Sequence, residues 1–136
     1  MRFLGFDGKN HVINFENCSR SVENPSSLHL KAREIIKSCL PYCVVYEEVS
    51  LVGCKLNQSV LVADFFIPQL SIIVEVHGKQ HYKFTKFFHK TEADFKESIR
   101  RDQTKKDWCE LNNITYIELP YNQIKQWKKL INDKLG

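Results

Sequence analysis

Two apolar runs of strand length lie close together in the middle of the chain, VLVADFFI at residues 60–67 and LSIIVEV at residues 70–76. Pro68-Gln69 separates them, and such a pair favours a turn, so the pattern predicts two neighbouring strands with a tight connection. Each run contains one acid, Asp64 in the first and Glu75 in the second. Because a carboxylate in a buried strand is costly unless it is paired, the two acids point to a shared partner such as a divalent cation.

Two histidines follow the second acid. Glu75 and His77 are two positions apart in a strand, so their side chains project from the same face. Gly78 ends the strand, and His81 follows within one turn. We therefore expect two acids and two histidines to converge at one end of the two strands, as a site rather than as part of the core.

The N-terminal half predicts a hairpin, a helix and a further strand. Asp7-Gly8 is a turn signal that predicts a β-hairpin over residues 2–15, and residues 16–27 are polar and predict a loop. Ser26 or Ser27 can cap a helix that runs to about Leu40 and buries a stripe made of Leu28, Ala32, Ile35, Ile36 and Cys39. Residues 43–52 predict a strand with Glu47 and Glu48 facing solvent, and residues 53–59 predict a loop.

The C-terminal half predicts a long helix, a strand and a last helix. Thr91 can cap a helix that runs to about Asn112, and Asn112-Asn113 favours a left-handed stop. Residues 114–119 predict a strand, Pro120 ends it, and residues 122–135 have the pattern of an amphipathic helix. The order of elements predicts one α/β domain in which helices flank a mixed central sheet, with an N-terminal β-hairpin.

Size and cysteine content set the class of protein. With 136 residues, the chain has the length of one domain. Its sequence contains neither a membrane-spanning apolar run nor a signal-peptide pattern, so we expect a cytoplasmic protein. The five cysteines are an odd, scattered set that favours a reducing compartment, and the close pair Cys39 and Cys43 lacks the two further ligands of a structural zinc site.

The charge of the chain is unevenly placed. The formal net charge is +4, with seven Lys/Arg against eight Asp/Glu in residues 1–78 and thirteen against eight in residues 79–136. A polyanion that lay across the acid and histidine cluster would be bound by the Lys and Arg side chains of this second half. The alternative is a set of solvated helix faces, of which Lys125, Lys128 and Lys129 are an example. Aromatic residues near the start of this second half could stack on bases or cover the two strands, namely Tyr82, Phe84, Phe87 and Phe88.

The spacing of these residues resembles a known family. The pattern consists of Asp64, ten further residues and then Glu75-x-His77-Gly78-x-x-His81, and Arg101-Asp102-x-x-Lys105 follows it. This pattern is similar to that of the EDxHD branch of the PD-(D/E)XK nuclease superfamily. That branch includes very-short-patch-repair mismatch endonucleases and homing-type endonucleases, usually from bacteria and phages. The resemblance covers about residues 26–122, with residues 1–25 as an N-terminal hairpin and loop and residues 123–136 as a C-terminal helix. It implies a restriction-endonuclease-like fold.

The resemblance also implies roles for individual residues. Asp64 and Glu75 match the metal-binding carboxylates, and His81 and Asp102 match the branch's histidine and second acid. The implied catalytic set is therefore Asp64, Glu75, His77, His81 and Asp102, and the cationic residues expected to contact nucleic acid are Lys79, Lys83, Arg101 and Lys105.

Two positions depart from the family pattern. His77 stands where the branch commonly has Asp and where the wider superfamily has Lys, so it could ligate metal or hold a phosphate. His29 aligns with the branch's leading Glu and is a further candidate site residue. The nearby acid Glu34 lies five residues later and would point elsewhere on a helix.

These observations predict a metal-dependent endonuclease that hydrolyses DNA, nicking it or cutting both strands as a homodimer. Mg²⁺, or Mn²⁺ in its place, would activate water and stabilise the transition state, and His81 would transfer protons at neutral pH. Two alternatives remain open: a nuclease that cleaves RNA or branched DNA on the same site, and a nucleic-acid-binding module without cleavage. Specificity would come from loops, the N-terminal hairpin, dimer geometry or a protein partner.

Overall fold

A four-stranded mixed sheet forms the centre of the protein. The computed structural model describes residues 1–84 and 90–135. The strands lie in the order β3-β4-β5-β6 and comprise Tyr46–Leu56, Ser59–Ile67, Ile72–His77 and Thr115–Pro120. β3, β4 and β5 pair antiparallel, whereas β5 and β6 pair parallel. A parallel pair needs a crossover connection, and helix α3 (Glu92–Leu111) lies within it. The mixed α/β sheet predicted from the order of elements is confirmed.

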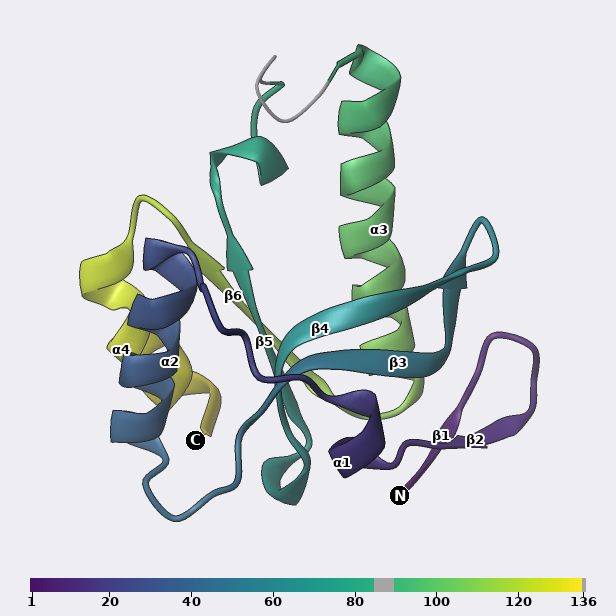
Figure 1. The fold of residues 1–136 in the computed structure, drawn as a ribbon, viewed down its shortest axis with the longest axis horizontal. Helices are drawn as coiled ribbons and strands as arrows, with labels where there is room; N and C mark the ends of the chain where they lie inside the picture. The colour runs from purple at the N-terminus through teal and green to yellow at the C-terminus, as the bar shows by residue number, and fades with distance from the viewer. Residues whose placement is uncertain (85–89, 136) are drawn as a thin grey trace.

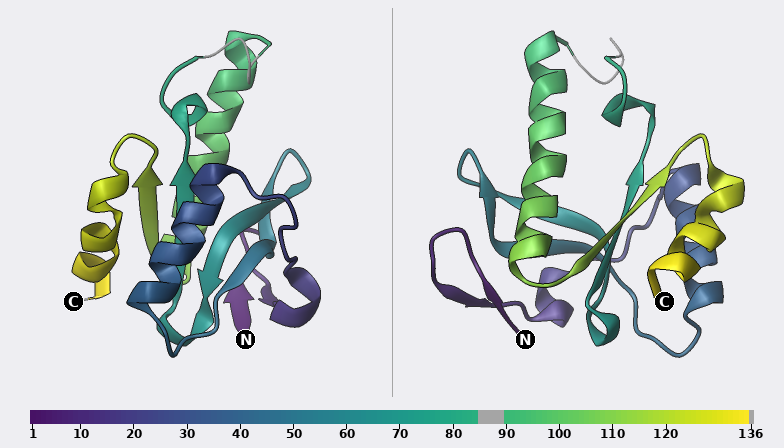
Figure 2. Two further views of the ribbon diagram at one scale, coloured as in Figure 1. Left: turned by 60° about the vertical axis from the view of Figure 1, so that its left-hand side comes forward. Right: turned by 180° about the vertical axis from the view of Figure 1, so that it is seen from behind.

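Helices cover both faces of the sheet (Figure 1). Helices α2 (Ser27–Cys39) and α4 (Trp127–Leu135) lie side by side against one face, and α3 lies on the other (Figure 2). This second face also packs against residues of the short helix α1 (Phe15–Cys18) and of a small separate sheet. The small sheet is formed by β1 (Arg2–Leu4) and β2 (Asn10–Val12). Each layer buries its own core around a tryptophan, Trp127 on the α2/α4 side and Trp108 on the α3 side. Both faces of the sheet are therefore largely covered by apolar side chains.

The predicted starts of α2 and α3 are confirmed by the side chains that cap them. The Ser26 hydroxyl accepts the His29 backbone N–H at 3.1 Å. Thr91 and Asp94 form a reciprocal capping box at the start of α3. At the other end of α3, Asn113 has a φ of 56°, the left-handed stop expected of this residue.

The predicted loop at residues 53–59 is wrong, because β3 continues to Leu56. The register of β3 against β4 shifts between Ser50 and Lys55, and Gly53 has a φ of 90° at this bulge. The chain reverses at Asn57-Gln58, whose φ values of 51° and 66° are typical of a tight hairpin turn. Glycine therefore marks a bulge inside the strand rather than its end.

Other boundaries differ from the prediction by a few residues. The stretch predicted as a loop at residues 16–27 begins inside α1, which Asn14 caps. The last helix begins at Trp127 rather than at residue 122, after a single 3₁₀ turn over Ile124–Gln126. Two further 3₁₀ turns follow β4 and β5, at Pro68–Leu70 and Lys79–His81. Phe87 and Phe88 lie outside the described residues. Within the described residues, no helix is long and apolar enough to cross a membrane.

Asn112 attaches the N-terminal hairpin to the end of α3. Its Oδ1 accepts the Leu4 N–H at 2.6 Å, and its Nδ2 donates to the Leu4 carbonyl at 3.0 Å. We expect Asn112→Ala to cost about 1–3 kcal/mol of unfolding free energy, because these backbone groups would lose their partner. Urea unfolding and amide exchange of β1 and β2 measure this. Asn132→Ala, on the exposed side of α4, is the control. Equal stability and exchange in both variants would contradict this prediction.

Candidate active site

The candidate site begins where β4 and β5 separate. Their backbone pairing runs from Ile67↔Ile72 to Phe65↔Val74 and stops before Asp64 and Glu75. There, carboxylate side chains accept hydrogen bonds from backbone N–H groups in place of backbone carbonyls. The Asp64 N–H donates to Glu75 Oε2 at 2.8 Å, and the Val76 N–H donates to Asp64 Oδ2 at 2.9 Å. Beyond this point β3 and β4 turn away from β5 and β6 (Figure 1). The two predicted carboxylates therefore face each other at the point where the sheet opens.

Lys105 of α3 supplies the positive charge beside these acids. Glu75 is only 1% exposed, and the Lys105 ammonium forms an ion pair with its Oε1. The same ammonium donates to the Val62 carbonyl at 3.2 Å. Burial would lower the pKa of Lys105, but the charge and hydrogen bond of Glu75, together with the charges of Asp64 and Asp102, raise that pKa. Lys105, expected on the nucleic-acid surface, thus contacts the centre of the site.

Asp64 lies in a less favourable environment. Burial, followed by the charge of Glu75, raises its pKa well above the ordinary value. The partner of Glu75 Oε1 is the Lys105 ammonium. Two neighbouring buried carboxylates that repel each other offer oxygen ligands of the kind that a hard cation such as Mg²⁺ or Mn²⁺ prefers. Asp64 and Glu75 therefore fit the cation that the sequence predicted.

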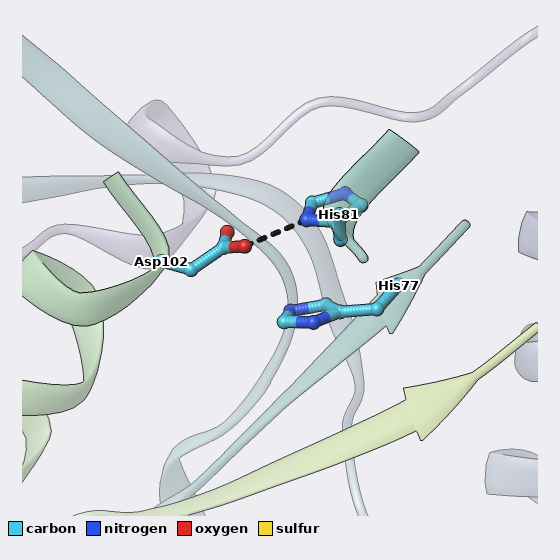
Figure 3. Close-up of side chains that lie close together, drawn as sticks. All are labelled: His77, His81 and Asp102. Carbon is cyan, nitrogen blue, oxygen red and sulfur yellow. Dashed lines mark hydrogen bonds and ion pairs between the residues drawn. The ribbon is translucent and has the colours of Figure 1, made fainter. Parts of the chain in front are cut away.

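His81 and Asp102 form a second pair at the edge of the site (Figure 3). His81 Nδ1 lies 2.7 Å from Asp102 Oδ2. Burial would raise the pKa of Asp102, but the hydrogen bond from His81 and its charge outweigh burial, so the pKa is lowered. An ionised carboxylate can only accept, so Nδ1 carries a proton, and in the neutral ring Nε2 is the nitrogen with the lone pair. His81 lines a pocket of about 420 Å³ that Asp64, Glu75 and Lys105 also line. A water in that pocket could give a proton to Nε2.

His77 lies beneath His81. The two rings stack on each other (Figure 3), and their centroids lie 4.3 Å apart with an angle of 12° between the planes. His77 Nε2 is 2.9 Å from the Tyr116 hydroxyl, and Nδ1 is 3.3 Å from Glu118 Oε1. Burial is the largest influence on His77 and lowers its pKa, which favours the neutral ring. Burial also raises the pKa of Tyr116, so its hydroxyl keeps a proton to donate to Nε2. His77 is thereby held as a fixed support for His81.

His77, His81 and Asp102 also form a potential metal cluster, since one ligand atom from each lies within 4.8 Å of the others. An imidazole lone pair lies in the plane of its ring. Two rings stacked 12° apart, with centroids 4.3 Å from each other, therefore hold their lone pairs in two separate, nearly parallel planes, which do not meet at one ion. A metal shared by both histidines would require one ring to turn. The arrangement favours a base and its orienting acid over a metal centre at this position.

The prediction that Glu47 faces solvent is wrong, whereas the Glu48 side chain is 28% exposed. The Glu47 side chain is 14% exposed, and its Oε1 lies 2.7 Å from His29 Nε2 and 2.9 Å from Arg33 Nη2. Burial would raise the pKa of Glu47, but the hydrogen bonds from Arg33 and His29 lower it. His29, the further candidate, lines the pocket and stacks on Phe65 while paired to Glu47. Glu48 lines the same pocket, a site residue that the sequence did not single out.

The predicted nucleic-acid-binding cations lie at different places around the site. Lys79 and Lys83 are exposed in and just after the turn that carries His81. Arg101 is exposed on α3 next to Asp102, 3.9 Å from Glu97. Lys125, Lys128 and Lys129 are exposed on the last 3₁₀ turn and α4. Tyr82, near the site, donates its hydroxyl to Glu118, and its ring lies 6.0 Å from that of Tyr121.

Comparisons with known proteins give distant partial relatives. No protein-family model and no solved structure matches the chain. It is 45% identical over 58 residues to uncharacterized protein 307L of Invertebrate iridescent virus 6 and 40% identical over 58 residues to uncharacterized protein 033L of Invertebrate iridescent virus 3. It is also 34% identical over 59 residues to uncharacterized protein 094L of Frog virus 3. Each match covers 43% of this chain and 29%, 30% and 38% of the respective relatives, so the chain spans less than half of their length.

The raised pKa of Asp64 predicts a stability change with pH. An acid whose pKa is raised in the folded state contributes stability that is complete below its unfolded pKa, here 3.8, and is lost as pH rises through the folded value. Without divalent cations, Asp64→Asn should therefore raise the melting temperature at pH 7 by about 3–6 °C, the shift that about 1 kcal/mol produces in a chain of this size. Near pH 3.8 the gain should disappear.

Thermal unfolding in EDTA between pH 3.5 and pH 8 measures this effect. Asp133→Asn is the matched control, because Asp133 is exposed on α4. A lower melting temperature for Asp64→Asn than for the wild type at pH 7 would show that the carboxylate is stabilising, contrary to the pKa argument.

Proposed function

We propose that this protein is a metal-dependent endonuclease that hydrolyses phosphodiester bonds in DNA. The observation that carries the proposal is the pairing of Asp64 with the buried Glu75 where the sheet opens, in one pocket with His81. Carboxylates suit a hard cation, and a histidine oriented by an acid suits proton transfer at neutral pH. The order α, β, β, β, α, β of residues 26–122 agrees with the restriction-endonuclease-like fold that the sequence resemblance implies.

Asp64 and Glu75 would hold the divalent cation through carboxylate oxygens. When bound, the cation would polarise a phosphate oxygen and stabilise the charge of the transition state. Its charge would also relieve the repulsion that raises the pKa of Asp64. Lys105, already paired with Glu75, keeps one compensating charge in the site when no cation is present.

The residues around the carboxylates would carry out the proton transfer. The oxygen of a water molecule would attack phosphorus while His81 Nε2 takes its proton. The bond from phosphorus to the leaving oxygen then breaks, and that oxygen takes a proton from solvent. Asp102 holds His81 in the tautomer that leaves Nε2 free to accept. His77 fixes the plane of the His81 ring from below. Such a positioned base contributes about 10²–10⁴-fold to the rate.

Cations on the surface would hold the polyanion. Lys79 and Lys83 lie beside the turn that carries His81, and Arg101 lies one residue before Asp102. Their side chains are exposed, so they can contact phosphates on either side of the scissile bond without reorganising the core. The proposal includes action in the cytoplasm, as a monomer or as a homodimer. RNA or branched DNA remains the alternative substrate for the same site.

A second candidate function rests on the Lys105 ion pair. Because this ammonium compensates Glu75 without a metal, the fold could serve as a nucleic-acid-binding module that does not cleave. Cleavage that depends on a divalent cation separates the two functions. A substrate panel of supercoiled DNA, branched DNA and RNA separates the nuclease alternatives.

Incubation of supercoiled plasmid with Mg²⁺ or Mn²⁺, and then with EDTA, tests the proposed function. We expect nicking or linearisation that EDTA abolishes. Glu75→Gln should lower the rate by more than about 100-fold, since loss of a ligand should cost at least as much as loss of a residue that supports one. His81→Gln should lower it by about 10²–10⁴-fold.

Glu110→Gln is the matched control, because Glu110 is an exposed acid near the end of α3. It should cut as fast as the wild type. Cleavage by the Glu75→Gln variant at the wild-type rate, or no cleavage of any nucleic acid by the wild type with either metal, would contradict the proposal.

A further inference from the structure

A partly buried glutamate on β6 contacts the groups around His81. Glu118 is in register with Glu75 on β5, so the two acids are neighbours on one face of the sheet. Neighbouring carboxylates repel each other, and α3 provides a lysine for each of them. Lys105 pairs with Glu75, and Lys106 Nζ lies 3.5 Å from Glu118 Oε1. Glu118 is thus held on the α3 side of the sheet, with its side chain 30% exposed.

Glu118 restrains the turn that carries His81. Tyr82 directly follows His81, and its hydroxyl donates a hydrogen bond to Glu118 Oε2. Burial, followed by this hydrogen bond, raises the pKa of Tyr82 above its ordinary value, so the hydroxyl keeps its proton. Tyr82 is 41% exposed, so packing covers only part of it. The hydrogen bond therefore ties a half-exposed stretch of chain to β6.

Two further contacts of Glu118 reach the other groups that hold the His81 ring. Its Oε1 lies 3.3 Å from Nδ1 of His77, whose ring stacks on that of His81 (Figure 3). Its partner Lys106 lies four residues after Asp102, on the same face of α3. One carboxylate thus contacts the residue that follows His81, the ring beneath it, and the helix whose acid pairs with it.

We propose that Glu118 is a positioning residue that keeps the His81 ring paired through Nδ1 with Asp102. Among the residues that the structure describes, His81 lines the pocket and Glu118 does not. Glu118 therefore acts through Tyr82 and His77 rather than by touching a substrate. This inference deepens the proposed function and rests on it for the consequence in catalysis. The orientation of the ring belongs to the protein alone and is measurable without metal or substrate.

Nitrogen-15 NMR of the histidine rings at pH 8, without metal or substrate, tests this role. In the wild type the two His81 signals should lie far apart, because Nδ1 keeps the proton that it donates to Asp102. Glu118→Ala removes the acceptor of the Tyr82 hydroxyl, and Tyr82→Phe removes the hydroxyl while keeping the ring. In both variants the proton should be shared between the two ring nitrogens, so the two His81 signals should move toward each other.

A conservative variant separates positioning from an ion pair that only stabilises the fold. Glu118→Gln keeps an oxygen that can accept from Tyr82 but loses the charge that faces Lys106. Its His81 signals should therefore stay closer to those of the wild type than the signals of Glu118→Ala do. Asp107→Asn is the matched control, because Asp107 is an exposed acid of α3 that also has a side-chain partner, and it should keep wild-type signals.

Steady-state cleavage of DNA measures the consequence for catalysis. Glu118→Ala and Tyr82→Phe should each lower kcat by about 10–100-fold, the usual effect of removing a residue that supports a functional group, and should leave KM unchanged. The double variant should be no slower than the slower single variant, because both changes break the same hydrogen bond. Asp107→Asn should cut at the wild-type rate.

The outcomes separate this inference from the proposed function. Wild-type His81 signals in folded Glu118→Ala and Tyr82→Phe would overturn the inference, and so would equal signals in Glu118→Ala and Glu118→Gln. A rise in KM at unchanged kcat would also overturn it, since that result indicates contact with the substrate. Should Glu118→Ala unfold, Tyr82→Phe decides, because it removes only a hydroxyl. Shifted His81 signals in a protein that cleaves no nucleic acid would support the positioning and contradict the proposed function.

Discussion

The ion pair between Glu75 and Lys105 is the interaction on which the site depends. It places a carboxylate that is 1% exposed at the centre of the sheet and joins β5 to α3 through a lysine. An unpaired charge at this depth would cost several kcal/mol, about 3–5 by comparison with other buried pairs that lose one partner. Because Glu75 is held in place, its second carboxylate oxygen accepts a hydrogen bond from the Asp64 N–H. β4 can therefore separate from β5 at this point without leaving that backbone N–H unsatisfied.

The opening of the sheet and the geometry of the histidines follow from this arrangement. α3 carries both Lys105 and Asp102, one turn apart, so the helix that neutralises Glu75 also orients His81. His77 ends β5 on the same face as Glu75 and meets the His81 ring at stacking distance. One helix and one strand end thus position the carboxylate pair and the His81–Asp102 pair relative to each other, which is what the proposed phosphodiester hydrolysis would require of a rigid protein.

Local signals in the sequence predicted much of this fold. The caps at Ser26 and Thr91 and the stop at Asn113 act within a few residues, and the spacing of Asp64, Glu75 and His81 predicted their convergence. Contacts between distant segments were not predictable in this way. Glu47 pairs with His29 across 18 residues, and Lys105 meets the Val62 carbonyl across 43. Glu48 and Asp64 line the same pocket, and this depends on how β3 lies against β4, which the sequence of β3 does not reveal.

Anomalous diffraction at the manganese edge, from crystals equilibrated with Mn²⁺, tests the central claim most directly. The account predicts one strong peak between the carboxylates of Asp64 and Glu75, in the pocket that Glu48 and Lys105 also line. A peak among His77, His81 and Asp102 would identify the other cluster of potential ligands as the metal centre. That result, or no peak at either place, would contradict a catalytic cation at the opening of the sheet.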